Sequence, residues 1–258
     1  GLPREALQFV QGAGQVGCAM AADTGIAGVA FTGSTEVARL INRTLAAPNG
    51  PIVPLIAETG GLNGLFVDTT ALKEQVVDDV LVSAFNSAGQ RCSSLRILFL
   101  PKDTADGVLE TLLGAMDELV IGDPADPRTD IGPIIDAEAK ANLDKHIAKM
   151  KTEAKLLKQL DVSKQNGSQG GGNFFGPAVI ELNSLDQIDK EVFGPILHIV
   201  RYDPAEIEKI GAQLAAKRYG LTLGIHSRLE SFARDVQPGV PAGNVYFNRI
   251  IVGAVVGV

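Results

Sequence analysis

The most informative part of the chain reads Phe85-Asn86-Ser87-Ala88-Gly89-Gln90-Arg91-Cys92-Ser93-Ser94, and it leads directly into the apolar run from Leu95 to Leu100. This pattern predicts an amphipathic helix, a break at Gly89 and a buried strand, with Cys92 in the loop between them. A free thiol has a pKa of about 8.5, and a neighbouring cation such as Arg91 increases the fraction of thiolate. The alternative for Cys92 is a small buried hydrophobic residue.

A carboxylate follows another apolar segment upstream. Residues 52 to 56 predict a buried strand, and Glu58 stands at its end in Ala57-Glu58-Thr59-Gly60-Gly61. In open α/β sheets, ligands bind at the carboxyl ends of strands. Apolar surroundings raise the pKa of a glutamate towards neutrality, which suits a general base. The alternative is a Glu that simply faces water.

Residues 1–57 predict a βαβ arrangement. We expect strands at 7–10 and 28–31, a helix that opens at a glycine-rich turn and runs through Ala22, and a second helix from Thr35. Gly12, Gly14 and Gly17 match G-x-G-x-x-G, but no acidic residue follows at the required distance. Gly33 and Ser34 are the better phosphate site, because the N–H groups of a helix N-terminus face a pyrophosphate there. A plain N-cap at Ser34 is the alternative.

The rest of the chain alternates strand and helix patterns. We expect strands at 64–67, 95–100, 174–182 and 196–200, helices at 77–88, 107–120 and 136–160, and loops at 122–133 and 165–172. This alternation predicts an α/β fold with a parallel sheet.

Composition excludes several classes of function. The chain has 258 residues, 45% of them hydrophobic, and a formal net charge of −7, so nucleic acid and anionic membranes are not expected as partners. We find no apolar run of the length that spans a membrane. Two cysteines predict a reducing compartment, the cytoplasm, with Cys18 a core thiol. The three histidines, at 146, 198 and 226, share no ligand spacing, so no metal site is expected.

Four segments carry a resemblance to a known family. They are Phe31-Thr32-Gly33-Ser34-Thr35-Glu36-Val37-Ala38, Glu58-Thr59-Gly60-Gly61, Gly89-Gln90-Arg91-Cys92 and Glu191-Val192-Phe193-Gly194-Pro195. In this order and at these spacings they resemble the aldehyde dehydrogenase superfamily. Residues 57–61 and 76–96 look most like the L-glutamate γ-semialdehyde (Δ1-pyrroline-5-carboxylate) dehydrogenase domain of bacterial proline utilization A.

The resemblance implies a fragment of the aldehyde dehydrogenase fold. Residues 1–60 would be the second half of a Rossmann-like NAD-binding domain, and residues 61–258 a parallel-sheet catalytic domain truncated at its end. A flavin (FAD) would belong only to a proline dehydrogenase domain further upstream. A homo-oligomer is expected for the full-length protein, and the segment alone is expected to bind NAD weakly and turn over little.

The resemblance also implies roles for single residues. Cys92 would attack a small-molecule aldehyde, and Glu58 would activate the water that hydrolyses the thioester. Gly33 and Ser34 would hold the NAD pyrophosphate, Glu191 the nicotinamide ribose, and Phe193 would pack near the nicotinamide ring. Ser93 and Arg91 would contact the substrate.

Two alternatives remain open at this stage. One is another aldehyde dehydrogenase, such as one for succinate semialdehyde, and the other is a non-catalytic interaction module. Without the resemblance, Glu191 would be predicted to be solvated.

Overall fold

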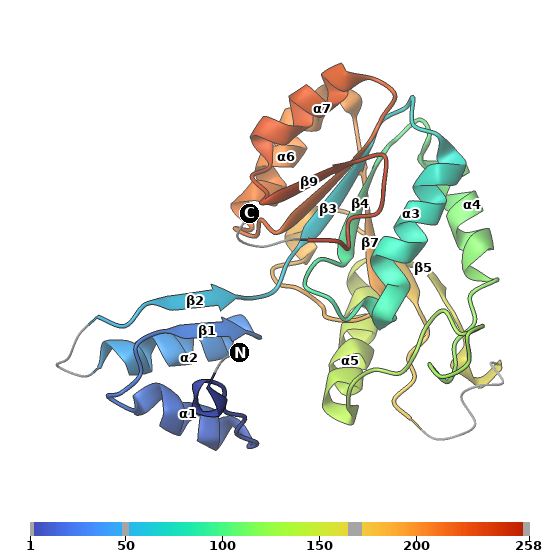
Figure 1. Ribbon diagram of the computed structural model, residues 1–258. Coiled ribbons are helices and arrows are strands. Elements are labelled where there is room, and N and C mark those ends of the chain that lie inside the picture. The colour runs from blue at the N-terminus through green and yellow to red at the C-terminus, as the bar shows by residue number, and fades with distance from the viewer. Residues whose placement is uncertain (1–2, 48–51, 165–171, 255–258) are drawn as a thin grey trace. The chain divides into compact units, whose positions relative to one another are not determined.

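The chain divides into two compact units. A computed structural model describes residues 3–47, 52–164 and 172–254, and its units are Gly1–Gly60 and Gly61–Val258. Residues 165–171 of the predicted loop lie outside the described ranges. Each unit has its own sheet, so each is described by itself (Figure 1).

The first unit is a small α/β unit. Its elements are a 3-10 turn η1 (Arg4–Ala6), α1 (Gly14–Ala22), β1 (Val29–Thr32), α2 (Thr35–Ala46) and β2 (Leu55–Glu58). The strands β1 and β2 pair in parallel, with Thr32 opposite Glu58. The predicted helices and the strand at 28–31 are therefore present, each within a residue or two of its expected position.

Three expectations for this unit are wrong. Residues 7–10 form no strand, and Phe9 is 85% exposed. Cys18 is exposed and is not a core thiol. The strand β2 is not buried, since Ile56 is 62% exposed. The exposure of Cys18 and Ile56 has a common cause, because within residues 3–47 and 52–60 two strands and two helices are too few to cover both faces of the pair.

The second unit is built on a seven-stranded sheet with the order β5-β6-β7-β4-β3-β8-β9. The strands are β3 (Asn63–Val67), β4 (Leu95–Pro101), β5 (Lys155–Gln159), β6 (Ala178–Glu181), β7 (Ile196–Tyr202), β8 (Thr222–His226) and β9 (Asn244–Phe247). Among the strands that the described residues form in this sheet, β5 and β6 pair antiparallel and every other pairing is parallel. The predicted α/β fold with a mostly parallel sheet is confirmed.

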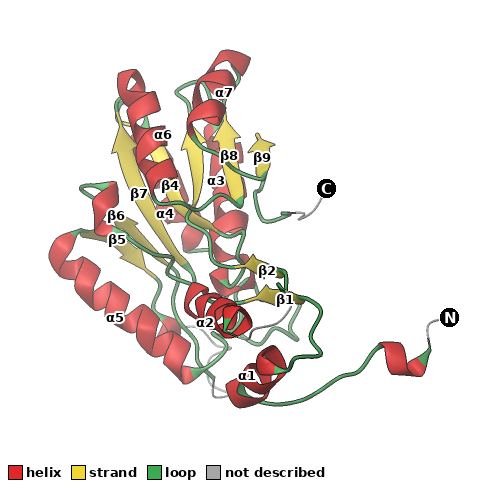
Figure 2. Cartoon of the chain, turned by 90° about the vertical axis from the view of Figure 1, so that its left-hand side faces the viewer, coloured by secondary structure: helices red, strands yellow, loops and turns green. Residues whose placement is uncertain are grey.

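Helices cover both faces of this sheet. They are α3 (Lys73–Phe85), α4 (Ala105–Met116), α5 (Ala137–Glu153), α6 (Ile207–Ala216) and α7 (Glu230–Val236). Figures 1 and 2 show α3 and α4 on one face and α6 and α7 on the other. The helix expected at 136–160 ends at Glu153, because the chain then adds the antiparallel edge strand β5. The strand expected from Phe174 begins only at Ala178.

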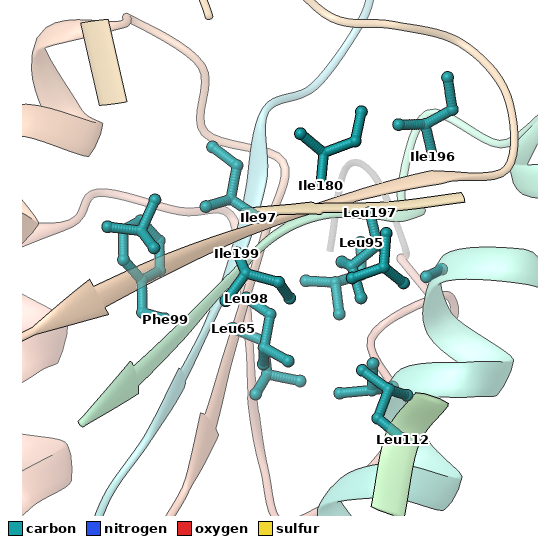
Figure 3. Packing of buried hydrophobic residues seen from close by; sticks show 14 of the residues in the cluster. Leu65, Leu95, Ile97, Leu98, Phe99, Leu112, Ile180, Ile196, Leu197 and Ile199 are labelled. Carbon is teal, nitrogen blue, oxygen red and sulfur yellow. The ribbon is translucent and has the colours of Figure 1, made fainter. Parts of the chain in front are cut away.

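The core lies between the central strands and their helices. Every residue of β3, β4 and β8 is buried, as expected for parallel strands covered on both faces. Figure 3 shows apolar side chains of β3, β4, β6 and β7 packed together with Leu112 of α4. This packing fixes the strand ends, and therefore the loops that join them.

No helix among the described residues combines the length and the apolar character needed to cross a bilayer.

Candidate active site

The candidate residues of the second unit gather at one edge of its sheet. Gly61, Cys92 and Gly194 lie in the loops that precede β3, β4 and β7. Because these three strands run parallel and are neighbours, the loops meet at the amino edge of the sheet. Cys92 is half-buried there.

The backbone before Cys92 turns sharply. The helix α3 ends at Phe85, earlier than the Ala88 that periodicity predicts, and a 3-10 turn η2 (Asn86–Gly89) follows. Ser87, Ala88 and Gly89 all have left-handed backbones, with φ of 55°, 53° and 63°. A Cβ at Gly89 would lie 2.3 Å from the Gly194 carbonyl oxygen, so only glycine permits this approach of the two loops.

Buried side chains hold the cysteine loop by its carbonyl groups. The Asn63 Nδ2 donates to the carbonyl oxygens of Cys92 (2.7 Å) and Ser94 (2.8 Å). The Asn63 Oδ1 accepts from the Thr222 N–H, and the Thr222 hydroxyl donates to the Ser93 carbonyl. Three consecutive carbonyl groups therefore point towards β3 and β8.

Arg96 anchors Glu191 beneath this loop. Its guanidinium is buried, and Nε and Nη2 donate to the Glu191 Oε1 at 3.1 and 2.9 Å. The Glu191 Oε2 accepts from the Gly61 N–H at 3.1 Å. The Glu191 side chain is only 10% exposed, so the expectation of a solvated Glu191 is wrong. A buried carboxylate needs such partners, which the surrounding loop sequence alone does not reveal.

Burial sets the electrostatics of this pair. It raises the pKa of Glu191 and lowers the pKa of Arg96, and the attraction between the two charges opposes both shifts. Phe193 is 46% exposed, and its ring centroid lies 5.3 Å from the Arg96 guanidinium carbon. The amino edge thus presents an anchored carboxylate and an exposed aromatic ring.

The two flanking candidates differ in their accessibility. Arg91 is exposed, and its Nε donates to the Ser87 hydroxyl at 3.1 Å. Ser93 is buried, and its hydroxyl donates to the Val252 carbonyl at 3.2 Å. Because a serine has one O–H, Ser93 can donate to a substrate only by releasing Val252.

The first unit carries the other candidates. Ser34 is the N-cap of α2, since its hydroxyl oxygen accepts from the Val37 N–H at 3.2 Å. Its O–H can still donate, so the cap does not exclude phosphate binding. Glu58 is half-buried at the carboxyl end of β2, where its backbone carbonyl accepts from the Gly33 N–H. Gly14 and Gly17 lie within α1.

Sequence reasoning missed a histidine pair. His146 on α5 and His198 on β7 share a hydrogen bond between their Nε2 atoms at 2.9 Å, and the His198 Nδ1 lies 3.1 Å from the Arg96 carbonyl oxygen. Within residues 3–47, 52–164 and 172–254, no group of three or more His, Cys, Asp or Glu side chains is placed to hold a metal ion.

Polar groups also gather at the opposite, carboxyl edge of the sheet. There the Ser227 hydroxyl donates to Asp68, and Asn248 exchanges two hydrogen bonds with the Ser227 backbone. A cavity of about 330 Å³ lies nearby, lined among others by Asp68, Lys73 and Thr104. Cys92 and Glu191 do not line it.

Comparisons with known proteins agree with this geometry. The bifunctional protein PutA of Klebsiella aerogenes is 49% identical over 264 residues, which cover 100% of this chain and 20% of the relative. A crystal structure of a bifunctional proline utilization A (PutA) protein superimposes with a TM-score of 0.93 at 53% identity, covering 100% of this chain and 26% of that one. The structure of a 1-pyrroline-5-carboxylate dehydrogenase from Thermus, with bound NAD, gives a TM-score of 0.82 at 32% identity, covering 97% of this chain and 48% of that one.

This chain therefore spans about a fifth of the length of its curated PutA relative. The family model described as "Aldehyde dehydrogenase family" matches residues 1–257, almost the whole chain. Together with the cysteine loop, the anchored Glu191 and the mostly parallel sheet, this match shows that the chain belongs to the aldehyde dehydrogenase family.

Proposed function

We propose that this chain is the aldehyde-oxidising part of a longer protein of proline catabolism, which converts L-glutamate γ-semialdehyde to L-glutamate with NAD. The observation that carries the proposal is the half-buried Cys92, in a loop held by Asn63 at the edge where Glu191 is anchored. The identity to PutA over the whole chain supports the choice of substrate.

Cys92 is the proposed nucleophile. Its thiolate attacks the aldehyde carbon and forms a thiohemiacetal, and the oxyanion of this adduct accepts a hydrogen bond from the Cys92 N–H. The loop is preorganised for this step, because its carbonyl groups are already held by buried donors.

The residues present fit a dinucleotide. The Glu191 Oε1 already accepts two hydrogen bonds and Oε2 one, so Oε2 keeps a lone pair for a ribose hydroxyl. The N-terminus of α2 at Gly33 and Ser34 suits a pyrophosphate. When bound, NAD supplies the hydride acceptor that turns the thiohemiacetal into a thioester.

Glu58 is the proposed base of the second half-reaction. It takes a proton from water, the resulting hydroxide attacks the thioester on Cys92, and the carbon–sulfur bond breaks to release the carboxylic acid. The roles of Glu58, Gly33 and Ser34 rest on their position in the motifs of the family and on the local structure of the first unit.

The first test is NAD reduction by the full-length protein with Δ1-pyrroline-5-carboxylate as substrate. We expect turnover by the wild type and none by Cys92→Ala, because no other group forms the thioester. Cys18→Ala is the matched control, since the Cys18 thiol is exposed and has no assigned role. Turnover by Cys92→Ala equal to that of the wild type would reject the nucleophile.

The same assay tests the substrate separately. If the wild type is inactive with Δ1-pyrroline-5-carboxylate but oxidises succinate semialdehyde, the substrate assignment is wrong and the dehydrogenase assignment stands. Inactivity with every aldehyde tested would leave the non-catalytic alternative.

A further inference from the structure

One buried side chain of the second unit contacts both loops at the amino edge. The Arg96 guanidinium makes two hydrogen bonds to Glu191, one from Nη1 to the Gly194 carbonyl (3.0 Å) and one from Nη2 to the Arg91 carbonyl (3.1 Å). It is 1% exposed. Arg96 therefore joins the loop of the nucleophile to the loop that carries Glu191.

The contact with the Arg91 carbonyl has a consequence for Cys92. A trans peptide is planar, so the Cys92 N–H points opposite to the Arg91 carbonyl of the same peptide unit. Two donors hold that carbonyl, the Arg96 Nη2 and the Ser94 N–H (3.1 Å), and together they direct the Cys92 N–H away from the core. The next peptide plane is held by Asn63 through the Cys92 carbonyl. Among the described residues, none accepts a hydrogen bond from the Cys92 N–H.

The charge of Arg96 acts on the same site. The helix α3 ends at Phe85, so its C-terminus, the negative end of its dipole, lies towards the amino edge where the cysteine loop begins. The positive charge of Arg96 and the negative charge of a Cys92 thiolate attract each other. Arg91, the neighbour in sequence, is turned to Ser87 instead.

A lysine could not make these contacts. The planar guanidinium offers five N–H donors in a fixed fork, whereas an ammonium offers three on a flexible stem. The four hydrogen bonds of Arg96 reach three separate acceptor groups in different directions. The charge and the geometry of Arg96 can therefore be tested apart from each other.

We propose that Arg96 is a positioning residue that holds the oxyanion-binding N–H of Cys92 and the ribose-binding carboxylate of Glu191 in one rigid arrangement, so that a single side chain prepares both the nucleophile and the cofactor site. This inference rests on the proposed function in taking Cys92 as the nucleophile and Glu191 as a cofactor ligand.

The test is Arg96→Lys in the full-length protein, read by two reactions of Cys92 that need no cofactor. In acyl transfer from p-nitrophenyl acetate, a carbon–sulfur bond forms, p-nitrophenolate leaves and an oxyanion develops on the way. In alkylation by iodoacetamide, sulfur displaces iodide and no oxyanion forms. Mass spectrometry of the Cys92 peptide separates this thiol from every other one.

We expect Arg96→Lys to slow acyl transfer about 100-fold, as when an oxyanion donor is lost, and alkylation less than tenfold, because the positive charge remains. The KM for NAD should rise as well, because Glu191 loses its two-point anchor. Arg201→Lys on β7 is the matched control, since Arg201 pairs with Glu181 and Asp106 away from this edge. It should change neither rate.

A second variant distinguishes slow acylation from a loss of the folded state. Arg96→Met combined with Glu191→Leu removes both charges, which a core often tolerates, and should acylate as slowly as Arg96→Lys. Wild-type acylation by either folded variant would overturn the proposal. Because acyl transfer requires neither NAD nor the natural aldehyde, these outcomes stand even if the substrate assignment fails. If Cys92 of the wild type is not acylated, the nucleophile assignment fails, and the proposal fails with it.

Discussion

A hydrogen-bonded histidine pair packs against the strand residue Arg96. The Arg96 carbonyl can only accept, so the His198 Nδ1 carries the proton, and the His146 Nε2 must then donate to the His198 Nε2. Burial lowers the pKa of His198 to about 3 and that of His146 to about 4. Both rings are therefore neutral in the folded chain at neutral pH.

This pair predicts a loss of stability in mild acid. An unfolded histidine has a pKa of about 6.5, so below that pH the unfolded chain takes up protons that the folded chain refuses. The stability that the two neutral histidines contribute is fully present above pH 6.5, and it is lost as the pH falls towards their pKa values in the folded chain. At pH 5, His198 alone should lower the free energy of unfolding by about 2 kcal/mol. Urea unfolding from pH 7.5 to 5, followed by circular dichroism, measures it.

The control for this prediction is His198→Gln. Glutamine keeps a donor for the Arg96 carbonyl but does not titrate. The free energy of unfolding should therefore fall less between pH 7.5 and 5 than in the wild type, because the part that His198 contributes is gone. An equal slope for both proteins would contradict the assignment of these pKa values.

Single residues show where sequence reasoning succeeded and where it stopped. Cys92 could be singled out because its motif has a known chemistry. Arg96 and His198 were read as members of apolar strands, and Asn63 stands directly before one, although a polar group in a buried strand must have a partner. Their presence could have predicted a buried network, but several of the partners lie far away along the chain, up to 159 positions for Asn63 and Thr222, and sequence spacing does not identify them.

Among the elements, the turn η2 predicts a sharp response to substitution. In Gly89→Ala the new Cβ would meet the Gly194 carbonyl at 2.3 Å, and alanine would have to adopt a φ of 63°. We expect a loss of about 1 to 3 kcal/mol in unfolding free energy, because strained backbone costs this much, together with a clear loss of turnover as the two loops separate. Thermal unfolding and the NAD-reduction assay measure the two effects.

Gly114→Ala provides the comparison. Gly114 lies on α4 with open space around its Cα, and alanine is the better helix former, so this variant should be more stable by about 0.5 to 1 kcal/mol. If the two alanine variants had the same melting temperature, the close approach at Gly89 would be refuted.

The elements themselves were predictable where one periodic pattern was long and bounded. The strands at β3, β4 and β7 and the helices α3 and α4 were located to within a few residues, because buried parallel strands have continuous apolar sequences. The segment at 7–10 was wrong because a short apolar run carries no information about a pairing partner. The switch from α5 to β5 was missed because Leu156 and Leu157 continue the helical stripe.

For the whole molecule, the proposed function divides the reaction between residues of the two units. Cys92 belongs to the second unit and Glu58 to the first. Glu58→Gln should leave acylation intact and slow hydrolysis of the thioester by about 10² to 10⁴, the usual contribution of a general base. Rapid mixing of the full-length protein with NAD and aldehyde should then show a burst of NADH equivalent to the Cys92 sites, followed by slow turnover.

If Glu58→Gln slowed the NADH burst and the later turnover to the same extent, Glu58 would not be the base of the second half-reaction. Glu5→Gln, on the exposed turn η1, supplies a matched change of charge in the same unit and should behave as the wild type.

At this scale the sequence predicted the fold class but not the exposure of the first unit. The family motifs imply the mostly parallel sheet, which the structure confirms. The exposure of Cys18 and Ile56 depends on how many elements cover a short sheet, and local periodicity does not report this.

The separation of the two edges of the large sheet has a practical consequence for labelling. The strand β4 is seven residues long, so its ends are roughly 20 Å apart at 3.3 Å per residue. Lys73 lies beyond the carboxyl edge, and its side chain is 44% exposed. A fluorophore attached there would report on the integrity of the second unit during catalysis without touching the thiol, so unfolding and inactivation could be recorded in one sample as separate signals.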